Sequence, residues 1–159
     1  MTFALSVHRT TTTDPLARPL LDELAHEYTT RYGSAHDLSR YPAAEFAPPH
    51  GAFLLLLEQG RPVAGGAYRR YDERTAELKR IWTHSAHRRR GLARRVLTVL
   101  EREAAARGYS RLCLTTGPRQ PEAKGLYLAS GYRPLFDVSA DPESIGPLPF
   151  EKFLETPRP

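Results

Sequence analysis

The stretch His87–Gly108, HRRRGLARRVLTVLEREAAARG, decides how the rest of the chain is interpreted. Its second part predicts an amphipathic helix, because apolar residues recur there at helical spacing: Leu92, Val96, Val99, Leu100 and Ala104. Arg107 and Gly108 are typical of a helix C-terminus. Five arginines surround Gly91 at the other end. They could bind nucleic acid, form a solvated charge run, or hold one small phosphate group.

The start of this helix lacks a side chain that could cap its free amides. Gly91 stands where Ser, Thr, Asp or Asn is preferred. The flanking arginines put positive charge at the positive end of the helix dipole, which costs about 0.3–1 kcal/mol per residue. An anion docked at this end would reverse that cost, because the amides, the dipole and the guanidinium groups would all point at it. Gly91 and Ala93 would let the anion approach the backbone closely.

Two alternatives remain for the arginines. A solvated basic helix end is the more common use of an arginine cluster in general, although its place between a strand and an amphipathic helix argues against it here. Nucleic-acid binding is less favoured, because the cations gather around one glycine and do not interleave with aromatic residues. The chain has neither G-x-x-x-x-G-K-[ST] nor G-x-G-x-x-G, which excludes both of these phosphate-binding motifs.

Composition places the chain among single-domain globular proteins. Its 159 residues fit one domain over residues 1–159, and the net charge of +5 favours anionic partners. The longest apolar run, residues 52–57, is too short to span a bilayer, and no leader segment is recognised, so we expect a cytoplasmic protein without membrane contact. The single cysteine, Cys113, forms no zinc pattern with the six histidines, so no metal site is predicted.

The hydrophobic pattern predicts a mixed α/β domain. Strands are expected at residues 3–8, 52–58, 62–71, 75–83, 111–115, 132–138 and 150–154, and helices at residues 20–33, 92–107 and 121–130. The three strands from residue 52 to residue 83 are separated by short turns and should form an antiparallel meander. The proline-rich segment 34–51 should be an ordered loop with one helical turn.

Two motifs resemble the GNAT superfamily of acyl-CoA-dependent N-acetyltransferases. Arg88-x-x-Gly91-x-Ala93 resembles its R/Q-x-x-G-x-G/A signature, and residues 120–132 resemble its N-x-x-A-x-x-L-Y-x-x-x-G-F/Y block, with Gln120 in place of the common asparagine. The resemblance covers nearly the whole chain. It implies a mostly antiparallel sheet of about seven strands flanked by helices, with the fourth and fifth strands splayed apart.

The resemblance also implies acetyl-CoA as co-substrate. Its pyrophosphate would lie at the glycine-centred loop, and its pantetheine arm would pair with the end of the fourth strand. The residues implied are Ile81, Trp82, Thr83, Arg88, Arg89, Arg90, Gly91, Leu92, Ala93, Arg94, Gln120 and Ala123. Because Gln120 stands where the family commonly has asparagine, the resemblance does not decide whether this residue forms the asparagine's usual hydrogen bond to the cofactor.

Amine acetylation by a thioester needs a neutral amine, a polarised carbonyl and a proton for the departing thiolate. By resemblance, Tyr127 is the acid beside the thioester sulfur; the alternative is core packing. Glu77 resembles a glutamate that acts as general base in histone-acetylating members; the alternative is an ion pair with Lys79 or an arginine, with ordered water assisting the amine. We assign no role to Cys113.

We therefore expect an N-acetyltransferase that moves an acetyl group from acetyl-CoA to a primary amine of a small molecule by direct attack in a ternary complex. A protein amine is the second candidate, and a non-catalytic acyl-CoA sensor or a nucleic-acid-binding domain belongs to a different class. Residues 28–46 and 137–147 should shape the acceptor site, where Glu45 or Asp37 could attract an ammonium group. A homodimer is possible.

Overall fold

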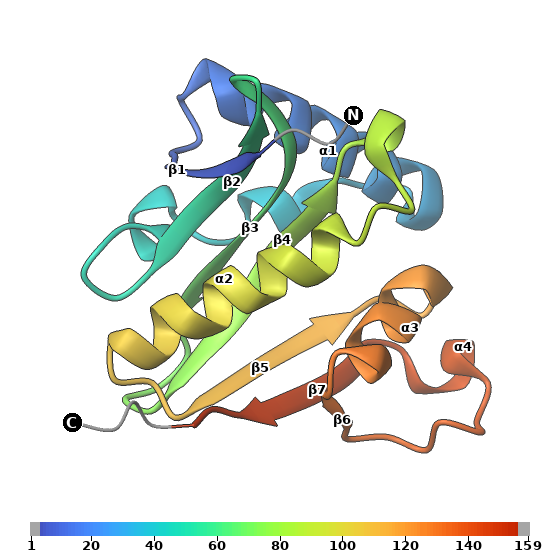
Figure 1. Ribbon diagram of the computed structural model, residues 1–159. Coiled ribbons are helices and arrows are strands. Elements are labelled where there is room, and N and C mark those ends of the chain that lie inside the picture. The colour runs from blue at the N-terminus through green and yellow to red at the C-terminus, as the bar shows by residue number, and fades with distance from the viewer. Residues whose placement is uncertain (1–3, 156–159) are drawn as a thin grey trace.

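One seven-stranded mixed sheet organises the chain in the computed structural model, which describes residues 4–155 (Figure 1). The strand order is β1-β2-β3-β4-β5-β7-β6. The strands are β1 (Leu5–Arg9), β2 (Ala52–Glu58), β3 (Arg61–Arg70), β4 (Thr75–Thr83), β5 (Arg111–Thr116), β6 (Arg133–Pro134) and β7 (Leu148–Phe153). The helices are α1 (Arg18–Tyr32), α2 (Leu92–Ala106), α3 (Pro121–Ala129) and α4 (Pro142–Ile145). The expected fold class is confirmed; Met1, Thr2 and Phe3 lie outside the described residues.

Strands β4 and β5 form a short parallel pair and then separate. Strands β1 to β4 are an antiparallel meander, and β5 pairs with β7 along its full length. Between β4 and β5, however, only Thr75, Ala76 and Glu77 of β4 have partners, opposite Arg111, Leu112 and Cys113 of β5. Figure 1 shows the two strands diverging beyond this point. The divergence opens the sheet between the carboxyl ends of β4 and β5.

A β-bulge shifts the face of β4 beyond Glu77, where β4 has already separated from β5. Gly65 lies opposite Trp82 and Ala67 opposite Lys79, so Gly66 faces two residues, Arg80 and Ile81. Arg80 adopts a left-handed backbone conformation with φ of 59°. Because a bulge inserts one extra residue, it changes the face to which the following side chains point.

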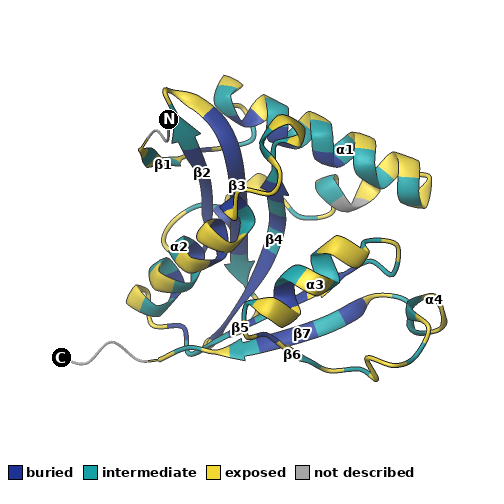
Figure 2. Cartoon of the chain, turned by 45° about the vertical axis from the view of Figure 1, so that its right-hand side comes forward, coloured by how far each residue is buried: buried dark blue, intermediate teal, exposed yellow. Residues whose placement is uncertain are grey.

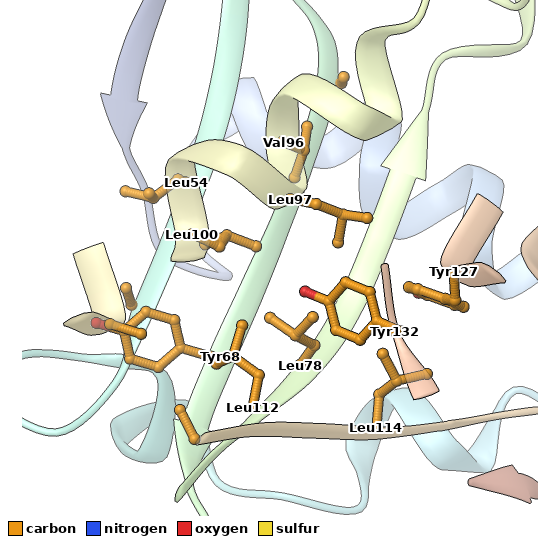
Figure 3. Close-up of a cluster of buried hydrophobic side chains, with 14 of the residues drawn as sticks. Leu54, Tyr68, Leu78, Val96, Leu97, Leu100, Leu112, Leu114, Tyr127 and Tyr132 are labelled. Atoms are coloured by element: carbon orange, nitrogen blue, oxygen red, sulfur yellow. The ribbon is translucent and has the colours of Figure 1, made fainter. Parts of the chain in front are cut away.

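Two hydrophobic clusters cover the two faces of the sheet. The larger one packs α2 and α3 on the strands, and Figure 3 labels ten of its members: Leu54, Tyr68, Leu78, Val96, Leu97, Leu100, Leu112, Leu114, Tyr127 and Tyr132. The smaller one packs α1 on the other face, with Leu20 and Leu24 against Leu55 and Trp82. Strands β2, β3 and β4 are consequently buried over most of their length (Figure 2). In the described part of the chain, no helix is long and apolar enough to cross a membrane.

The adjacent glycines Gly65 and Gly66 let both helical layers approach β3. A Cβ atom added to Gly65 would lie 2.9 Å from Leu20 Cδ1 of α1 and 2.9 Å from the backbone oxygen of Leu54. A Cβ atom added to Gly66 would lie 2.7 Å from Ile81 Cδ1 and 2.9 Å from Val96 Cγ1 of α2. All four distances are shorter than ordinary van der Waals contacts. Strand β3 therefore carries no side chain where the helices cross it.

The C-terminal third differs from the sequence-based expectation. The strand expected at residues 132–138 spans only Arg133–Pro134, and the expected loop that follows contains α4. Asp137 Oδ1 accepts hydrogen bonds from the backbone and hydroxyl groups of Ser139, at 2.9 and 2.7 Å, which turns the chain away from the sheet. The Asp141 side chain then caps α4 by accepting from the Glu143 amide at 3.2 Å. Strand β7 begins two residues before the expected residue 150.

We predict opposite effects for two glycine-to-alanine substitutions. Gly65→Ala should lower the free energy of unfolding by about 1–3 kcal/mol, because the new methyl group overlaps the Leu54 carbonyl, which cannot move without disturbing the sheet. The control Gly125→Ala, on the exposed surface of α3 with no atom within 4 Å, should raise it by about 0.5–1 kcal/mol. Urea titration measures both, and equal effects would contradict the close approach of α1 to β3.

Candidate active site

The amino end of α2 is open, as its sequence predicts. Gly91 is the N-cap residue, has a left-handed φ of 73°, and provides no capping side chain. Arg89, two residues earlier, is also left-handed, with φ of 65°. Apart from its chain neighbours, no described residue has an atom within 4 Å of the position of a Cβ on Gly91. The first-turn amides, which have no partner within a helix, therefore open toward free space.

A cavity of about 820 Å³ adjoins this helix start. Its walls come from α1, the end of β4, the loop before α2, and α3. It is lined by Asp22, Glu23, Leu24, His26, Glu27, Ile81, Trp82, Thr83, Ser85, Arg88, Arg89, Gly91, Leu92, Ala93, Arg94, Gln120, Glu122, Ala123, Leu126 and Tyr127. Every residue predicted to hold the cofactor lines it except Arg90. We call it the helix-start cavity.

Arg90 is the predicted cofactor residue that the structure does not bring to this cavity. Its guanidinium group forms an ion pair with Glu58 at the end of β2, and Nη1 lies 2.9 Å from His87 Nδ1. The hydrogen bond from Arg90 lowers the pKa of the Glu58 carboxyl group. Arg90 thus attaches the loop before α2 to the sheet, whereas Arg88, Arg89 and Arg94 face the cavity.

A second cavity, of about 580 Å³, lies beside the first. Its walls include residues from both regions expected to shape an acceptor site, residues 28–46 and 137–147. It is lined by Tyr28, Tyr32, Ser34, Leu38, Arg40, Tyr41, Phe46, Leu78, Lys79, Arg80, Ile81, Thr115, Thr116, Gly117, Pro118, Arg119, Gln120, Ala123, Tyr127, Glu143, Gly146 and Pro147. We call it the loop-side cavity. Four residues line both cavities: Ile81, Gln120, Ala123 and Tyr127.

Tyr127 stands where the two cavities meet. The residue is 6% exposed, and its ring packs against Tyr132 and Phe150 with centroid distances of 5.6 and 5.5 Å. Burial raises the pKa of the Tyr127 phenol above its usual value, so the hydroxyl group keeps its proton throughout the neutral range. Tyr127 thus packs in the core and also borders both cavities. The two alternatives predicted from the sequence, core packing and an acid beside the thioester sulfur, are therefore compatible.

Glu77 lies outside the linings of both cavities. It is the last β4 residue that pairs with β5, and it is buried. Its Oε1 atom accepts a hydrogen bond from Arg69 Nη1 at 2.9 Å, and Lys79 Nζ is 4.0 Å from Oε2. This arrangement is the ion pair stated above as the alternative to general-base catalysis.

A polar bridge joins α1 to the loop before α3 above the separation of β4 and β5. Gln120 Oε1 accepts from the Gly117 amide and from the Tyr32 hydroxyl group, both at 3.2 Å. Arg31 donates to the Arg119 carbonyl at 2.6 Å and forms an ion pair with Glu122. Sequence patterns did not identify this bridge, because its two halves are about 90 residues apart. It fixes Gln120 at the junction of the cavities.

Glu23 is a further residue that the sequence reading missed. From α1, its Oε1 atom accepts from Trp82 Nε1 and from the Ser85 amide, both at 2.9 Å, and its other oxygen accepts from the Ser85 hydroxyl group. Burial raises the pKa of the Glu23 carboxyl group, but the hydrogen bonds from Ser85 and Trp82 together lower it by more, so the net change is downward. Glu23 therefore fixes the end of β4 and the turn after it.

The remaining candidates have structural surroundings. Cys113 is half-buried, and burial raises the pKa of its thiol to about 11. Glu45 accepts from Arg69 and does not line the loop-side cavity, and the Asp37 side chain is outside the described part of the structure. Over residues 4–155, no cluster of three or more His, Cys, Asp or Glu could hold a metal ion.

Comparison with known proteins identifies the family. Residues 18–132 match the acetyltransferase (GNAT) family. A Bacillus subtilis (strain 168) protein described as the uncharacterized N-acetyltransferase YsnE is 38% identical over 118 residues, which are 62% of this chain and 78% of that protein.

Solved structures share the fold. A Klebsiella pneumoniae subsp. pneumoniae MGH 78578 protein, described as a candidate acyl-CoA N-acyltransferase, superposes with a TM-score of 0.74 and 27% identity, over 95% of this chain and 98% of that one. A GNAT family acetyltransferase of Elizabethkingia anophelis, solved with acetyl-CoA bound, superposes with a TM-score of 0.69 and 16% identity, over 94% and 98% of the two chains.

We predict that Glu23→Ala lowers the free energy of unfolding by about 1–3 kcal/mol at pH 7, because Trp82 and Ser85 lose their shared acceptor. The folded-state pKa of Glu23 lies below its usual 4.5, so the contribution is present above pH 4.5 and is lost as the pH falls through the lower value. The difference from wild type should therefore narrow in acid. Asp22→Ala, which removes only an exposed pair with Arg18 at 3.7 Å, is the control and should have little effect.

Proposed function

Because the chain belongs to the GNAT family of acetyltransferases, we propose that it transfers an acetyl group from acetyl-CoA to the primary amine of a small molecule, by direct attack in a ternary complex. The observation that carries this proposal is the pair of cavities that meet at Ile81, Gln120, Ala123 and Tyr127. Two substrates bound in adjoining cavities can react directly, without a covalent enzyme intermediate.

The helix-start cavity fits acetyl-CoA. The open amides of the first turn of α2, the positive end of its dipole and the guanidinium groups of Arg88, Arg89 and Arg94 suit a pyrophosphate group. Gly91 leaves room for its close approach. Beyond Glu77, the edge of β4 that faces away from β3 has no strand partner, so its backbone groups are available to the pantetheine amides. The GNAT acetyltransferase of Elizabethkingia anophelis was crystallised with acetyl-CoA bound.

The transfer requires one bond to form and one to break. The neutral amine attacks the thioester carbonyl carbon, a C–N bond forms, the C–S bond breaks, and the amine loses a proton. A backbone amide near Trp82 or Thr83 polarises the carbonyl oxygen. The Tyr127 hydroxyl group, protonated at neutral pH, donates a proton to the departing thiolate. Water in the loop-side cavity can take the amine proton, since Glu77 is bound by Arg69.

A small-molecule acceptor is supported by the size and walls of the loop-side cavity. Its volume of about 580 Å³ lies within the range of about 300–1,000 Å³ that is usual for small-molecule sites. Side chains from segments distant in sequence close around it, among them Tyr28, Tyr41 and Phe46 from the amino-terminal part. Arg119, whose carbonyl oxygen accepts from Arg31, also lines it and connects it to α1.

We predict that Gly91→Glu weakens acetyl-CoA binding by at least about 10-fold, because the new side chain occupies the position of the pyrophosphate and its negative charge repels that group. Gly108→Glu is a matched control, since Gly108 also has a positive φ, of 95°, and open space around it, but lies at the other end of α2. Arg90→Ala should change the affinity less than Arg88→Ala. Calorimetric titration with acetyl-CoA measures these effects, and preference of the wild type for DNA over acetyl-CoA would contradict the proposal.

We predict that Tyr127→Phe lowers kcat by about 10²-fold or more while leaving acetyl-CoA affinity within a factor of about 2, because the ring and its packing remain and only the proton donor is lost. Thiol release across a panel of primary amines measures kcat. Glu77→Gln serves as the comparison: a loss of kcat similar to that of Tyr127→Phe would restore Glu77 as the base, whereas lower stability with unchanged kcat supports its role as the ion-pair partner of Arg69. Unchanged turnover in Tyr127→Phe would remove the hydroxyl group from the mechanism.

A further inference from the structure

Arg80 occupies an unfavourable position beside the loop-side cavity. It is one of the two residues that the bulge in β4 places opposite Gly66, and its φ of 59° is uncommon for any residue other than glycine. Non-glycine residues in this conformation are concentrated at functional sites, where the strain aims a side chain. The Arg80 guanidinium group accordingly lies over the rings of Phe46 and Phe53, and the residue lines the loop-side cavity.

Among the described residues, no counter-charge accompanies the buried charge of Arg80. The residue is 7% exposed, and Nη2 donates to the Leu38 carbonyl oxygen at 3.1 Å. Nη1 is buried and has no hydrogen-bond partner among the described residues. Burial lowers the pKa of the guanidinium group, and Arg80 forms no ion pair with any carboxylate that the structure describes. A buried cation in such surroundings is costly unless an anion joins it.

The carboxylates near this face of the sheet are already bound elsewhere. Glu45 and Glu77 both accept hydrogen bonds from Arg69, at 2.8 to 3.0 Å. Glu143, which also lines the cavity, accepts from Arg119 at 2.8 Å. None of these carboxylates is paired with Arg80, so among the described residues no carboxylate neutralises it, and a bound anionic substrate could.

Lys79 adds a second positive charge beside Arg80. Successive side chains in a regular strand point to opposite faces, but the bulge lets both residues contact the segment 34–51: Lys79 lies over the Tyr41 ring at 5.1 Å and Arg80 over the Phe46 ring at 4.4 Å. Both residues line the loop-side cavity. The cavity therefore presents two adjacent cations on the wall opposite α3.

We propose that the acceptor amine carries a carboxylate group and that Arg80 binds this carboxylate, with Lys79 supplying further positive charge. The inference rests on the proposed function and names its substrate class: an amino acid or a related amino-carboxylate. A small rotation of the guanidinium group toward the cavity would present Nη1 and Nη2 to the two oxygens of one carboxylate, the planar fork geometry that arginine favours. A phosphate group suits the site less, because Phe46, Phe53 and the Leu38 carbonyl surround the fork with few other donors.

The test uses acceptor pairs that differ only in the acidic group. Each standard amino acid and 4-aminobutyrate is compared with its carboxamide, and phosphoethanolamine is compared with ethanolamine. Thiol release from acetyl-CoA gives kcat/KM, and calorimetric titration into protein saturated with coenzyme A gives acceptor affinity independently of turnover. For at least one pair, the wild type should prefer the carboxylate by about 10- to 100-fold.

Substitutions at Arg80 separate recognition from folding. Arg80→Met should abolish the preference for the carboxylate, change kcat/KM for the carboxamide less than about 3-fold, and leave the melting temperature unchanged or higher, because a buried unpaired charge is removed. Arg80→Lys, which keeps the charge but loses the fork, should retain part of the preference. Arg61→Met, at the exposed first residue of β3, is the control and should leave the preference intact.

The outcomes distinguish the two proposals. Carboxylate preference in binding without thiol release from any amine would sustain the role of Arg80 and refute the transfer reaction. Two outcomes would refute the role of Arg80 alone. One is transfer to amines with no preference for the carboxylate. The other is an Arg80→Met variant whose kcat/KM falls equally for the carboxylate and the carboxamide and whose melting temperature is lower. If the preference for phosphoethanolamine over ethanolamine exceeds that for any carboxylate over its carboxamide, the proposal that the acceptor carries a carboxylate is refuted.

Discussion

The separation of β4 from β5 is the constraint on which the rest of the structure depends. The two strands share only three residue pairs, after which each keeps its antiparallel neighbour and loses the other. A gap in the middle of a sheet exposes backbone hydrogen-bonding groups that must find partners. The bridge from Arg31 and Tyr32 to the Gly117–Gln120 loop holds the gap open at a fixed width. Both cavities border this gap and meet at Tyr127.

The many arginines divide by partner and not by position in the sequence. Arg90 is paired with Glu58, Arg69 with Glu45 and Glu77, and Arg31 with Glu122, so these residues tie elements together. Arg88, Arg89 and Arg94 instead line the helix-start cavity, where they strengthen the positive field at the end of α2. Among the described residues, Arg80 has no carboxylate partner and its buried Nη1 atom has no hydrogen-bond acceptor, so this residue links the cavity to a substrate class.

Sequence patterns predicted what local chemistry determines. The uncapped glycine start of α2, the meander and the amphipathic α2 could be predicted because each depends on residues close together in the chain. The strand expected at residues 132–138 was too long, since two aspartate-capped turns compete with strand pairing there. Glu23, Arg31 and Tyr32 could not be identified as parts of the site, because their partners lie between 59 and 91 residues away. The bulge in β4 likewise had no sequence signal at Arg80.

The sequence by itself determined the family-like order of elements, the uncapped, arginine-flanked helix start at Gly91 and the place of Tyr127 on α3, since these follow from periodicity, capping and short motifs. Only the tertiary structure decided which arginines face a cavity and which are neutralised. That choice depends on whether folding brings a carboxylate within about 4 Å of each guanidinium group. Folding brings Glu58 to Arg90, whereas no carboxylate in the described part of the chain pairs with Arg80, only ten residues earlier.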